Sequence, residues 1–263
     1  PQFARASKTH RTMIVSLTSL RLLDRFLSLI YPEICQTCRN HPAPAAESYI
    51  CQPCRSGVAG VRYIEAPFCN CCGLPFEGDI TVTFECANCR EQELKFRAAR
   101  AAVVLTGLVQ DVIHRYKYNH AVWFEPFLAD LLISRAAPAL SESHWDYIVP
   151  IPLHWLKLRE RSFNQSLRLA RQLSRATGIP LHTRLLKRIQ PTNTQTRLTR
   201  SERTENVKRA FAFRGRGAID GARIILIDDV LTTGATASAC AKLLLQNGAA
   251  VVDVWTVARG ILK

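Results

Sequence analysis

Residues 223–236 read Arg-Ile-Ile-Leu-Ile-Asp-Asp-Val-Leu-Thr-Thr-Gly-Ala-Thr, and this stretch is the strongest indication of fold class in the sequence. The apolar run at 224–227 has the length of a strand that is buried on both faces, as strands of parallel sheets are. Two carboxylates follow, then a turn of small residues, and then a helical pattern over residues 236–246. A strand that leads through a short turn into a helix is the repeating unit of α/β folds with a parallel sheet.

The same stretch carries a candidate ligand site, because ligands of parallel sheets bind beyond the carboxyl ends of the strands. The turn offers backbone N–H groups at a helix N-terminus, so we expect it to hold a monoester phosphate, with Gly234 allowing close approach. The two aspartates are acceptors suited to a pair of sugar hydroxyls, and a phosphate beside a diol indicates a ribose 5-phosphate. The alternative is that the aspartates cap a turn and the threonines cap the helix. The candidate binding residues here are Asp228, Asp229, Val230, Leu231, Thr232, Thr233, Gly234, Ala235 and Thr236.

Short aliphatic runs alternate with helical patterns on both sides of this stretch. We expect further strands at 101–106, 147–151 and 250–257, and helices at 108–118, 124–135 and 163–177. This alternation predicts an α/β domain over residues 98–263, with helices on both faces of a parallel sheet.

The cysteines predict a second kind of module before this domain. Nine of the ten cysteines lie between Cys35 and Cys89, and eight of them form four Cys-x-x-Cys pairs. Twelve residues separate the first two pairs and thirteen separate the last two, so each half fits one four-cysteine zinc site of the ribbon type. The candidate ligands are Cys35, Cys38, Cys51 and Cys54 for one site and Cys69, Cys72, Cys86 and Cys89 for the other.

The alternative for these cysteines is a disulfide framework, which an oxidising compartment would favour. We find no secretory signal in the sequence and expect a cytoplasmic protein, in which thiolates persist and bind metal. Four thiolates per ion leave no open position for water, so both Zn²⁺ ions are expected to be structural. We assign residues 32–97 to this double zinc ribbon and residues 13–31, which have helical apolar spacing, to a docking helix.

Composition and charge limit the class of protein. The chain has 263 residues, 48% of them hydrophobic, and a net charge of +14, which favours polyanionic partners. Residues 101–263 carry 23 basic and 12 acidic residues, so most of the excess charge lies in the expected α/β domain. No stretch reaches the roughly 20 uncharged apolar residues of a membrane helix, and we expect no membrane span.

At residues 224–236 the sequence resembles the type I phosphoribosyltransferases, which share a run of aliphatic residues, two acidic residues and a threonine-rich phosphate loop. More narrowly, the chain resembles the ComF family of competence proteins over about residues 22–259. The narrower resemblance rests on the ribbons and on four further motifs. These are Ile113-His114-x-x-Lys117-Tyr118, Val149-Pro150-Ile151-Pro152, Leu158-Arg159-Glu160-Arg161-Ser162-Phe163-Asn164-Gln165, and Gln195-Thr196-x-Leu198 with Arg203, Asn206 and Phe211 behind it.

The resemblance implies a Rossmann-like phosphoribosyltransferase domain that binds phosphoribosyl pyrophosphate with Mg²⁺. It also implies that a loop with Arg159 and Arg161 holds the pyrophosphate, and arginine forks suit diphosphate oxygens. Lys117 is a further candidate for the ligand crevice, and Arg197 and Arg203 lie in a basic stretch that resembles the closing flap of these enzymes. Ser162 stands where the family pattern usually has glycine, and we expect it to cap the helix at 163–177 instead.

Two functional hypotheses of different class follow. The first is an enzyme that transfers a phosphoribosyl group to an unknown acceptor, with Asp228, Asp229, Arg159 and Arg161 as the candidate catalytic residues. Thr232 stands where purine-salvage relatives often carry a carboxylate, which argues against a 6-oxopurine acceptor. The second is a non-catalytic adaptor that binds single-stranded DNA beside a helicase-like partner in DNA import. A salt dependence of single-strand affinity with a log–log slope near −3 would distinguish the adaptor.

Overall fold

The computed structural model describes residues 33–76, 78, 84–190, 210–215 and 219–261. Its main sheet has four parallel strands in the order β1-β6-β5-β2. The strands are β1 (Ala99–Val104), β6 (Val251–Arg259), β5 (Arg223–Leu231) and β2 (Tyr147–Pro150). The α/β class with a parallel sheet, predicted from the stretch at 223–236, is thereby confirmed.

β5 is an inner strand and is buried on both faces, as its apolar run predicts. Ile224 and Leu226 belong to one hydrophobic core, and Ile225 and Ile227 belong to the other. This division follows from the strand period of two, which sends successive side chains to opposite faces. The carboxylates of Asp228 and Asp229 lie within β5, which continues to Leu231 rather than ending before them.

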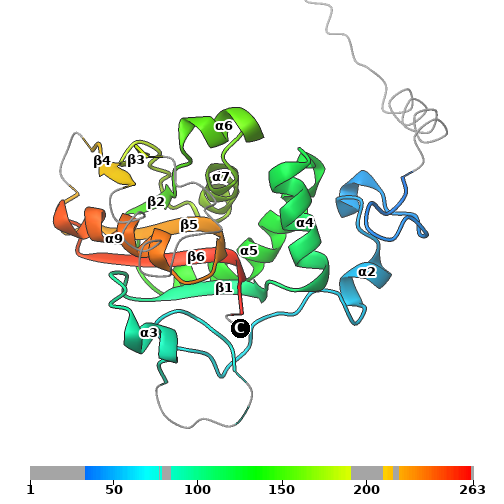
Figure 1. Cartoon of the computed structure of the whole chain (residues 1–263), viewed down its shortest axis with the longest axis horizontal. Helices are drawn as coiled ribbons and strands as arrows, with labels where there is room; N and C mark the ends of the chain where they lie inside the picture. Colours follow the sequence, from blue (N-terminus) through cyan, green and yellow to red (C-terminus); the bar gives the residue numbers. More distant parts are fainter. Residues whose placement is uncertain (1–32, 77, 79–83, 191–209, 216–218, 262–263) are drawn as a thin grey trace, which may run out of the picture.

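Helices cover both faces of the sheet (Figure 1). α4 (Gly107–Tyr118), α5 (Glu125–Ser141) and α7 (Gln165–Thr177) pack in the core on one face, and α9 (Ala235–Gln246) packs in the core on the other. The shorter elements are η1 (Ala45–Glu47), α2 (Gln52–Ser56), α3 (Ala87–Glu91), η2 (Val122–Phe124), α6 (Trp155–Arg161) and the antiparallel pair β3 (Leu186–Arg188) and β4 (Phe211–Phe213).

The two cysteine modules contact different parts of the α/β domain (Figure 1). The first module, which contains α2, lies beside α4: the Leu108 amide donates to the Ala59 carbonyl, and Arg115 donates to the Gln36 carbonyl. The second module, which contains α3, lies against β1, where the Ala99 amide donates to the Cys71 carbonyl. Its four cysteines share a hydrophobic core with β5, β6 and α9. All four cysteines of the second module therefore belong to a large core, whereas the first module forms a small cluster around Cys35, Ala43 and Cys51 and joins the other large core through Ile50.

The structure differs from the sequence-based prediction in two elements near the expected pyrophosphate loop. Residues 155–161 form the helix α6 rather than a loop, because the His154 ring nitrogen accepts from the Leu156 amide and caps its N-terminus. The following helix begins at Gln165, and Asn164 caps it by accepting from the amides of Ser166 and Leu167. The expectation that Ser162 caps this helix is wrong.

Among the residues that the structure describes, no helix combines the length and the apolar character that a bilayer crossing needs. The expected docking helix at 13–31 and the basic stretch with Arg197 and Arg203 lie outside the described residues.

Candidate functional site

Each cysteine module gathers four thiols at the spacing of a tetrahedral metal site. In the first, the Sγ atoms of Cys35 and Cys54 are 3.8 Å apart, and those of Cys38 and Cys51 are 3.7 Å apart. Zinc–sulfur bonds of about 2.3 Å place tetrahedral ligands about 3.8 Å from one another. The first module therefore fits zinc. The ring of His41 lies 3.5 Å from the Cys38 Sγ and lowers the pKa of that thiol to about 5.

The second module has the same geometry but a drier environment. Cys69 and Cys89 are 3.8 Å apart at their Sγ atoms, and Cys72 and Cys86 are 3.5 Å apart. All four side chains are buried, whereas Cys38 and Cys54 of the first module are partly exposed. The Cys86 amide donates to the Cys69 Sγ, a bond that favours the thiolate form which a metal requires. Both four-cysteine sets fit zinc ribbons, as the spacing predicted.

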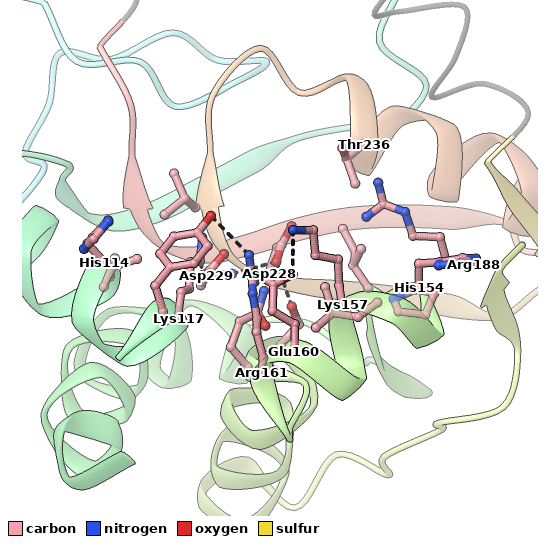
Figure 2. A pocket seen from close by; sticks show the side chains of 18 of the residues that line it. His114, Lys117, His154, Lys157, Glu160, Arg161, Arg188, Asp228, Asp229 and Thr236 are labelled. Carbon is pink, nitrogen blue, oxygen red and sulfur yellow. Dashed lines mark hydrogen bonds and ion pairs between the residues drawn. The ribbon is translucent and has the colours of Figure 1, made fainter. Parts of the chain in front are cut away.

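A cavity of about 690 Å³ opens at the carboxyl ends of β2 and β5. Figure 2 shows Asp228 and Asp229 in its middle, with His114 and Lys117 from α4 on one side and Arg188 from β3 on the other. Lys157 and Arg161 approach from α6, and Thr236 lies at the start of α9. Cationic side chains thus surround a pair of carboxylates in one concave site.

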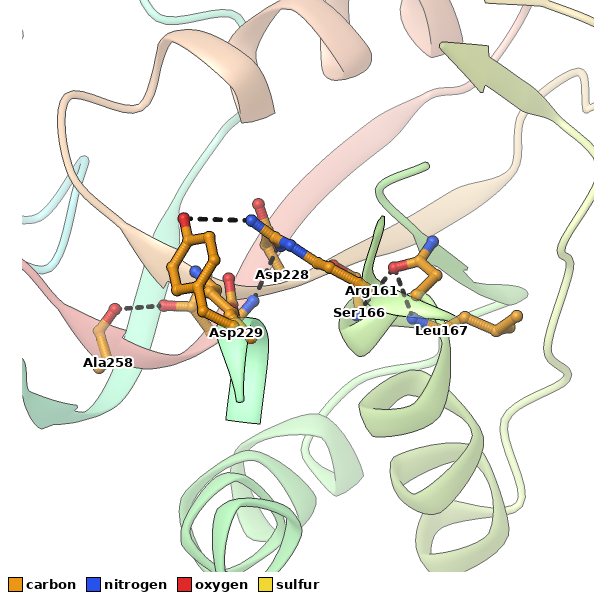
Figure 3. A network of polar contacts seen from close by, with 10 residues as sticks. Arg161, Ser166, Leu167, Asp228, Asp229 and Ala258 are labelled. Carbon is orange, nitrogen blue, oxygen red and sulfur yellow. Dashed lines mark hydrogen bonds and ion pairs between the residues drawn. The ribbon is translucent and has the colours of Figure 1, made fainter. Parts of the chain in front are cut away.

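Asp228 is held in place by two hydrogen bonds to one of its oxygens. The Ser166 hydroxyl donates to Oδ1 over 2.7 Å, and the Asp229 amide donates to the same atom over 2.9 Å (Figure 3). Burial raises the pKa of Asp228 to about 7, and the neighbouring Asp229 carboxylate adds to the rise. Asp228 therefore changes its charge near neutral pH.

Asp229 is paired with the cation that the sequence singled out. Its Oδ2 lies 2.6 Å from the Lys117 Nζ, and their side chains are only 4% and 17% exposed. The lysine comes from the last turn of α4, so the ion pair connects that helix to β5. Two adjacent aspartates thus have different environments, one with a cation and one with hydroxyl and amide donors.

Because residues 155–161 form a helix, only some of the basic residues expected to hold pyrophosphate line the cavity. Lys157 and Arg161 are four residues apart and line the cavity together, whereas Arg159 is not among its lining residues. Arg161 is 8% exposed; its guanidinium donates to the Tyr118 hydroxyl over 3.2 Å and lies 4.9 Å from the centre of that ring. The Arg161 Nε is buried and has no hydrogen-bond partner among the described residues.

Ser162 ends α6 in the left-handed conformation, with φ 63° and ψ −7°. This conformation costs a side chain about 1 kcal/mol, and glycine adopts it without that cost. We expect Ser162→Gly to raise the free energy of unfolding by about 0.5–1 kcal/mol, whereas Ser162→Ala, which keeps a Cβ, leaves it nearly unchanged. Urea unfolding of the three proteins measures both values, and an equal effect of glycine and alanine would rule out the conformational cause.

The expected phosphate loop is divided between the cavity and the protein interior. Val230, Thr232 and Thr236 line the cavity, whereas Leu231 is buried and Thr233, Gly234 and Ala235 are not among its lining residues. Gly234 has φ 85°, and a Cβ there would meet the side chains of Leu94 and Phe96 at about 3.4–3.5 Å. Gly234 therefore lies close to the segment that follows Cys89, the last cysteine of the second module.

Several lining residues were not singled out as ligand-binding candidates. Ser166 and Gln165 enter the cavity because Asn164 starts α7 beside β5, and Arg188 enters from β3. The side chain of Gln165 is buried, and its Oε1 has no hydrogen-bond partner among the described residues. Only the motif that ends in Asn164-Gln165 drew attention to this segment in the sequence, without assigning it a role.

Three comparisons with known proteins bear on this arrangement. The family model described as "Double zinc ribbon domain" matches residues 26–90. The chain is 29% identical to competence protein F of Haemophilus influenzae, over 86% of this chain and 96% of that protein, and 31% identical to competence protein ComFC of Bacillus subtilis, over 80% and 84%. Among solved structures, the purine phosphoribosyltransferase of Pyrococcus horikoshii is similar with 19% identity and a TM-score of 0.34, over 51% of this chain and 83% of that one.

Proposed function

The chain belongs to the family of the competence proteins F and ComFC, and we propose that it binds phosphoribosyl pyrophosphate, or a related ribose 5-phosphate, in the cavity at the end of β5. The observation that carries this proposal is the joining of the Asp228–Asp229 pair, Thr232 and Thr236 in one cavity with Lys117 and Arg161. Carboxylates next to phosphate-binding donors match a sugar that bears both hydroxyls and a phosphate.

Each part of such a ligand has a counterpart in the cavity. The turn at Thr232 and the N-terminus of α9 suit the 5-phosphate, since a helix N-terminus attracts anions. The two aspartates suit the 2- and 3-hydroxyls, and Lys157 and Arg161 suit a pyrophosphate. The site is about 690 Å³, within the usual range for small-molecule pockets.

Mg²⁺ fits this site through the chemistry of its donors, since it is commonly bound by one or two carboxylates together with phosphate oxygens of the ligand. Asp228 and Asp229 would supply the carboxylates, and the ion would neutralise charge on the pyrophosphate. The protein's own part in a transfer reaction would be to position the sugar and to stabilise the departing pyrophosphate with Arg161 and Lys157.

A ligand series tests the proposal by calorimetry in the presence of Mg²⁺. We expect phosphoribosyl pyrophosphate to bind more tightly than ribose 5-phosphate, and ribose 5-phosphate about tenfold more tightly than 2-deoxyribose 5-phosphate, which lacks one hydroxyl of the diol. Absence of binding for all three compounds would overturn the proposed function. Equal affinity for the two pentose phosphates would instead contradict the role of the aspartate pair.

The pKa of Asp228 predicts how this affinity depends on pH. A carboxylate accepts from sugar hydroxyls and binds Mg²⁺, whereas the protonated acid is a poorer partner, so affinity should rise as pH increases from 6 to 8 through the pKa of about 7. Phosphate monoesters also titrate near pH 6, and this contributes to the rise. Calorimetry of Asp228→Asn over the same range isolates the phosphate contribution, and identical slopes for both proteins would contradict the assignment.

We further propose that ligand binding accompanies a role in DNA uptake, which the names of the competence relatives support. A second cavity, of about 970 Å³, is lined by His182, Arg184, Lys187 and Arg214, away from the aspartate pair. Arg184, Lys187 and Arg214 are exposed, and their charges suit a polyanion. Single-stranded DNA that binds without displacing ribose 5-phosphate would support separate sites for the two ligands.

A further inference from the structure

Arg259, the last residue of β6, connects the expected phosphate loop to the second cysteine module. Its side chain is fully buried, with 0% exposure. Nη1 donates to the carbonyls of Leu231, Thr232 and Gly260 over 3.1, 2.6 and 2.6 Å. On the other side of the guanidinium, Nε donates to the Cys72 carbonyl over 3.0 Å and Nη2 donates to the Cys72 Sγ over 3.2 Å.

The charge of this buried guanidinium points to the metal site. No aspartate or glutamate within the described ranges forms an ion pair with Arg259. Four thiolates around one divalent ion carry a net charge of −2, and Cys72 belongs to such a set. A metal–thiolate centre at the second module would therefore supply the countercharge that Arg259 needs in a dry interior.

A second contact joins the same two parts of the protein. Asn88 lies between the ligands Cys86 and Cys89, and its Nδ2 donates to the Thr233 carbonyl over 3.2 Å. Three successive carbonyls of the loop, at Leu231, Thr232 and Thr233, thus accept from Arg259 or from the second module. On the same side of the loop, Gly234 lies close to the side chains of Leu94 and Phe96.

This arrangement determines where the N–H groups of the loop point. In a trans peptide the carbonyl and the following N–H point in opposite directions, and the one cis peptide in the described chain is Ala66–Pro67. Carbonyls at 231–233 that face the module therefore aim the N–H groups of 232–234 away from it. None of the described residues accepts a hydrogen bond from these three N–H groups. Of these residues Thr232 lines the cavity, so its N–H is the donor of the loop that is best placed for a phosphate.

We infer that Arg259 and Asn88 are positioning residues that couple sugar-phosphate binding to metal occupancy of the second four-cysteine site, and of that site alone. This inference rests on the proposed function. Within the described residues, the first module makes no hydrogen bond to the phosphate loop; it meets the α/β domain at α4, through the carbonyls of Gln36 and Ala59. Coupling is reciprocal: a metal that strengthens ligand binding is itself held more tightly when the ligand is bound.

The test measures zinc loss from the wild-type protein with and without saturating ribose 5-phosphate and Mg²⁺. A chelating dye reports zinc release, and cysteine alkylation mapped by mass spectrometry shows which thiols are freed. We expect the ligand to slow alkylation of Cys69, Cys72, Cys86 and Cys89 at least fivefold and to leave the four cysteines of the first module unchanged. A protein that binds the ligand but shows equal protection at both sites, or none, would overturn the coupling.

Variants separate positioning from stability. Arg259→Gln should weaken ribose 5-phosphate binding at least tenfold, abolish the protection by ligand, and leave the affinity for inorganic pyrophosphate at the α6 side unchanged. Arg259→Lys keeps the charge but lacks the planar fork, so we expect it to restore part of the affinity. Asn88→Ala removes the hydrogen bond to the Thr233 carbonyl and should weaken ribose 5-phosphate binding about threefold, so it tests the inference even if Arg259→Gln does not fold.

Arg115→Gln is the matched control, because Arg115 makes the corresponding contact to the first module. It should alter neither the ligand affinity nor the protection. A folded Arg259→Gln or Asn88→Ala protein with wild-type affinity and wild-type protection would overturn the inference. A wild-type protein that binds no sugar phosphate would instead overturn the proposed function, and the coupling with it.

Discussion

Replacing Asp228 with asparagine is expected to weaken binding of phosphoribosyl pyrophosphate about 100-fold and, at pH 8, to stabilise the protein. The loss of affinity follows because an amide NH₂ would replace the free carboxylate oxygen, and hydrogen bonds to a charged group contribute about 1.5–3 kcal/mol. The gain in stability follows because the pKa of Asp228 is raised to about 7. Its charged form is less favourable in the folded chain than in the unfolded chain.

The sign of the pH dependence distinguishes this cause from others. A carboxyl with a raised pKa binds its proton more tightly when folded, so wild-type stability falls relative to Asp228→Asn as pH rises from about 4 to 7. The two proteins should be about equally stable near pH 4. At pH 8 the variant should be more stable by on the order of 2 kcal/mol, allowing for partial exposure of the carboxyl. Its Oδ1 can still accept from Ser166 and from the Asp229 amide.

Asp229→Asn is the matched control for this prediction, because it should weaken binding to a similar extent but destabilise the protein. Its carboxylate pairs with the Lys117 ammonium at 2.6 Å, and the variant leaves that largely buried cation without its partner. The expected cost is about 1–3 kcal/mol. Urea unfolding at pH 4, 6 and 8 with calorimetry at pH 8 tests both variants. Stability changes of the same sign in the two variants at pH 8 would contradict the environments described for the aspartates.

The strands and the long helices could be predicted because local pattern and tertiary burial agree there. The run at 224–227 is buried on both faces of the sheet, and α7 places Leu169, Ala170 and Leu173 in the core with arginines between them. The sequence did not predict α6, because its apolar residues Trp155, Leu156 and Leu158 are exposed. They therefore do not show the helical spacing that a buried face produces. The start of α6 depends on a cap by His154, a residue outside the usual capping set.

The sequence predicted the site residues that lie in one continuous segment, but not those that other elements bring to the cavity. Asp228, Asp229, Thr232 and Thr236 come from one stretch, and the structure places all four in the cavity. Arg188 and Ser166 reach it through the packing of β3 and α7, which no short motif records. Arg259 could not be recognised from sequence, since an arginine at the end of a strand ordinarily suggests an exposed residue. Its role depends on contact between segments 187 residues apart.

The burial of the two cysteine sets predicts which zinc site matters more for the stability of the fold. Cys69, Cys72, Cys86 and Cys89 all belong to a hydrophobic core with Phe96, Leu226 and Leu231. In the first module, Cys35 and Cys51 lie in a small cluster, and only Ile50 and the partly buried Cys54 reach the core beside α4. Loss of the second metal would leave four thiols and a buried guanidinium inside the main core. Loss of the first would open a partly exposed module that lies beside α4.

We therefore expect Cys86→Ser to abolish cooperative unfolding or lower its midpoint by more than about 10 °C, and Cys51→Ser to lower it by only a few degrees while one zinc ion is retained. Structural zinc binds with about 10 kcal/mol or more, which is comparable to the whole stability of a typical domain, and each kcal/mol shifts the midpoint by roughly 2–4 °C. Calorimetric scans with zinc stoichiometry measured for each variant test this. The expected difference between the two variants rests on the deeper burial of the second cysteine set. An equal drop in unfolding midpoint for Cys86→Ser and Cys51→Ser would therefore contradict it and show that the two modules contribute alike to stability.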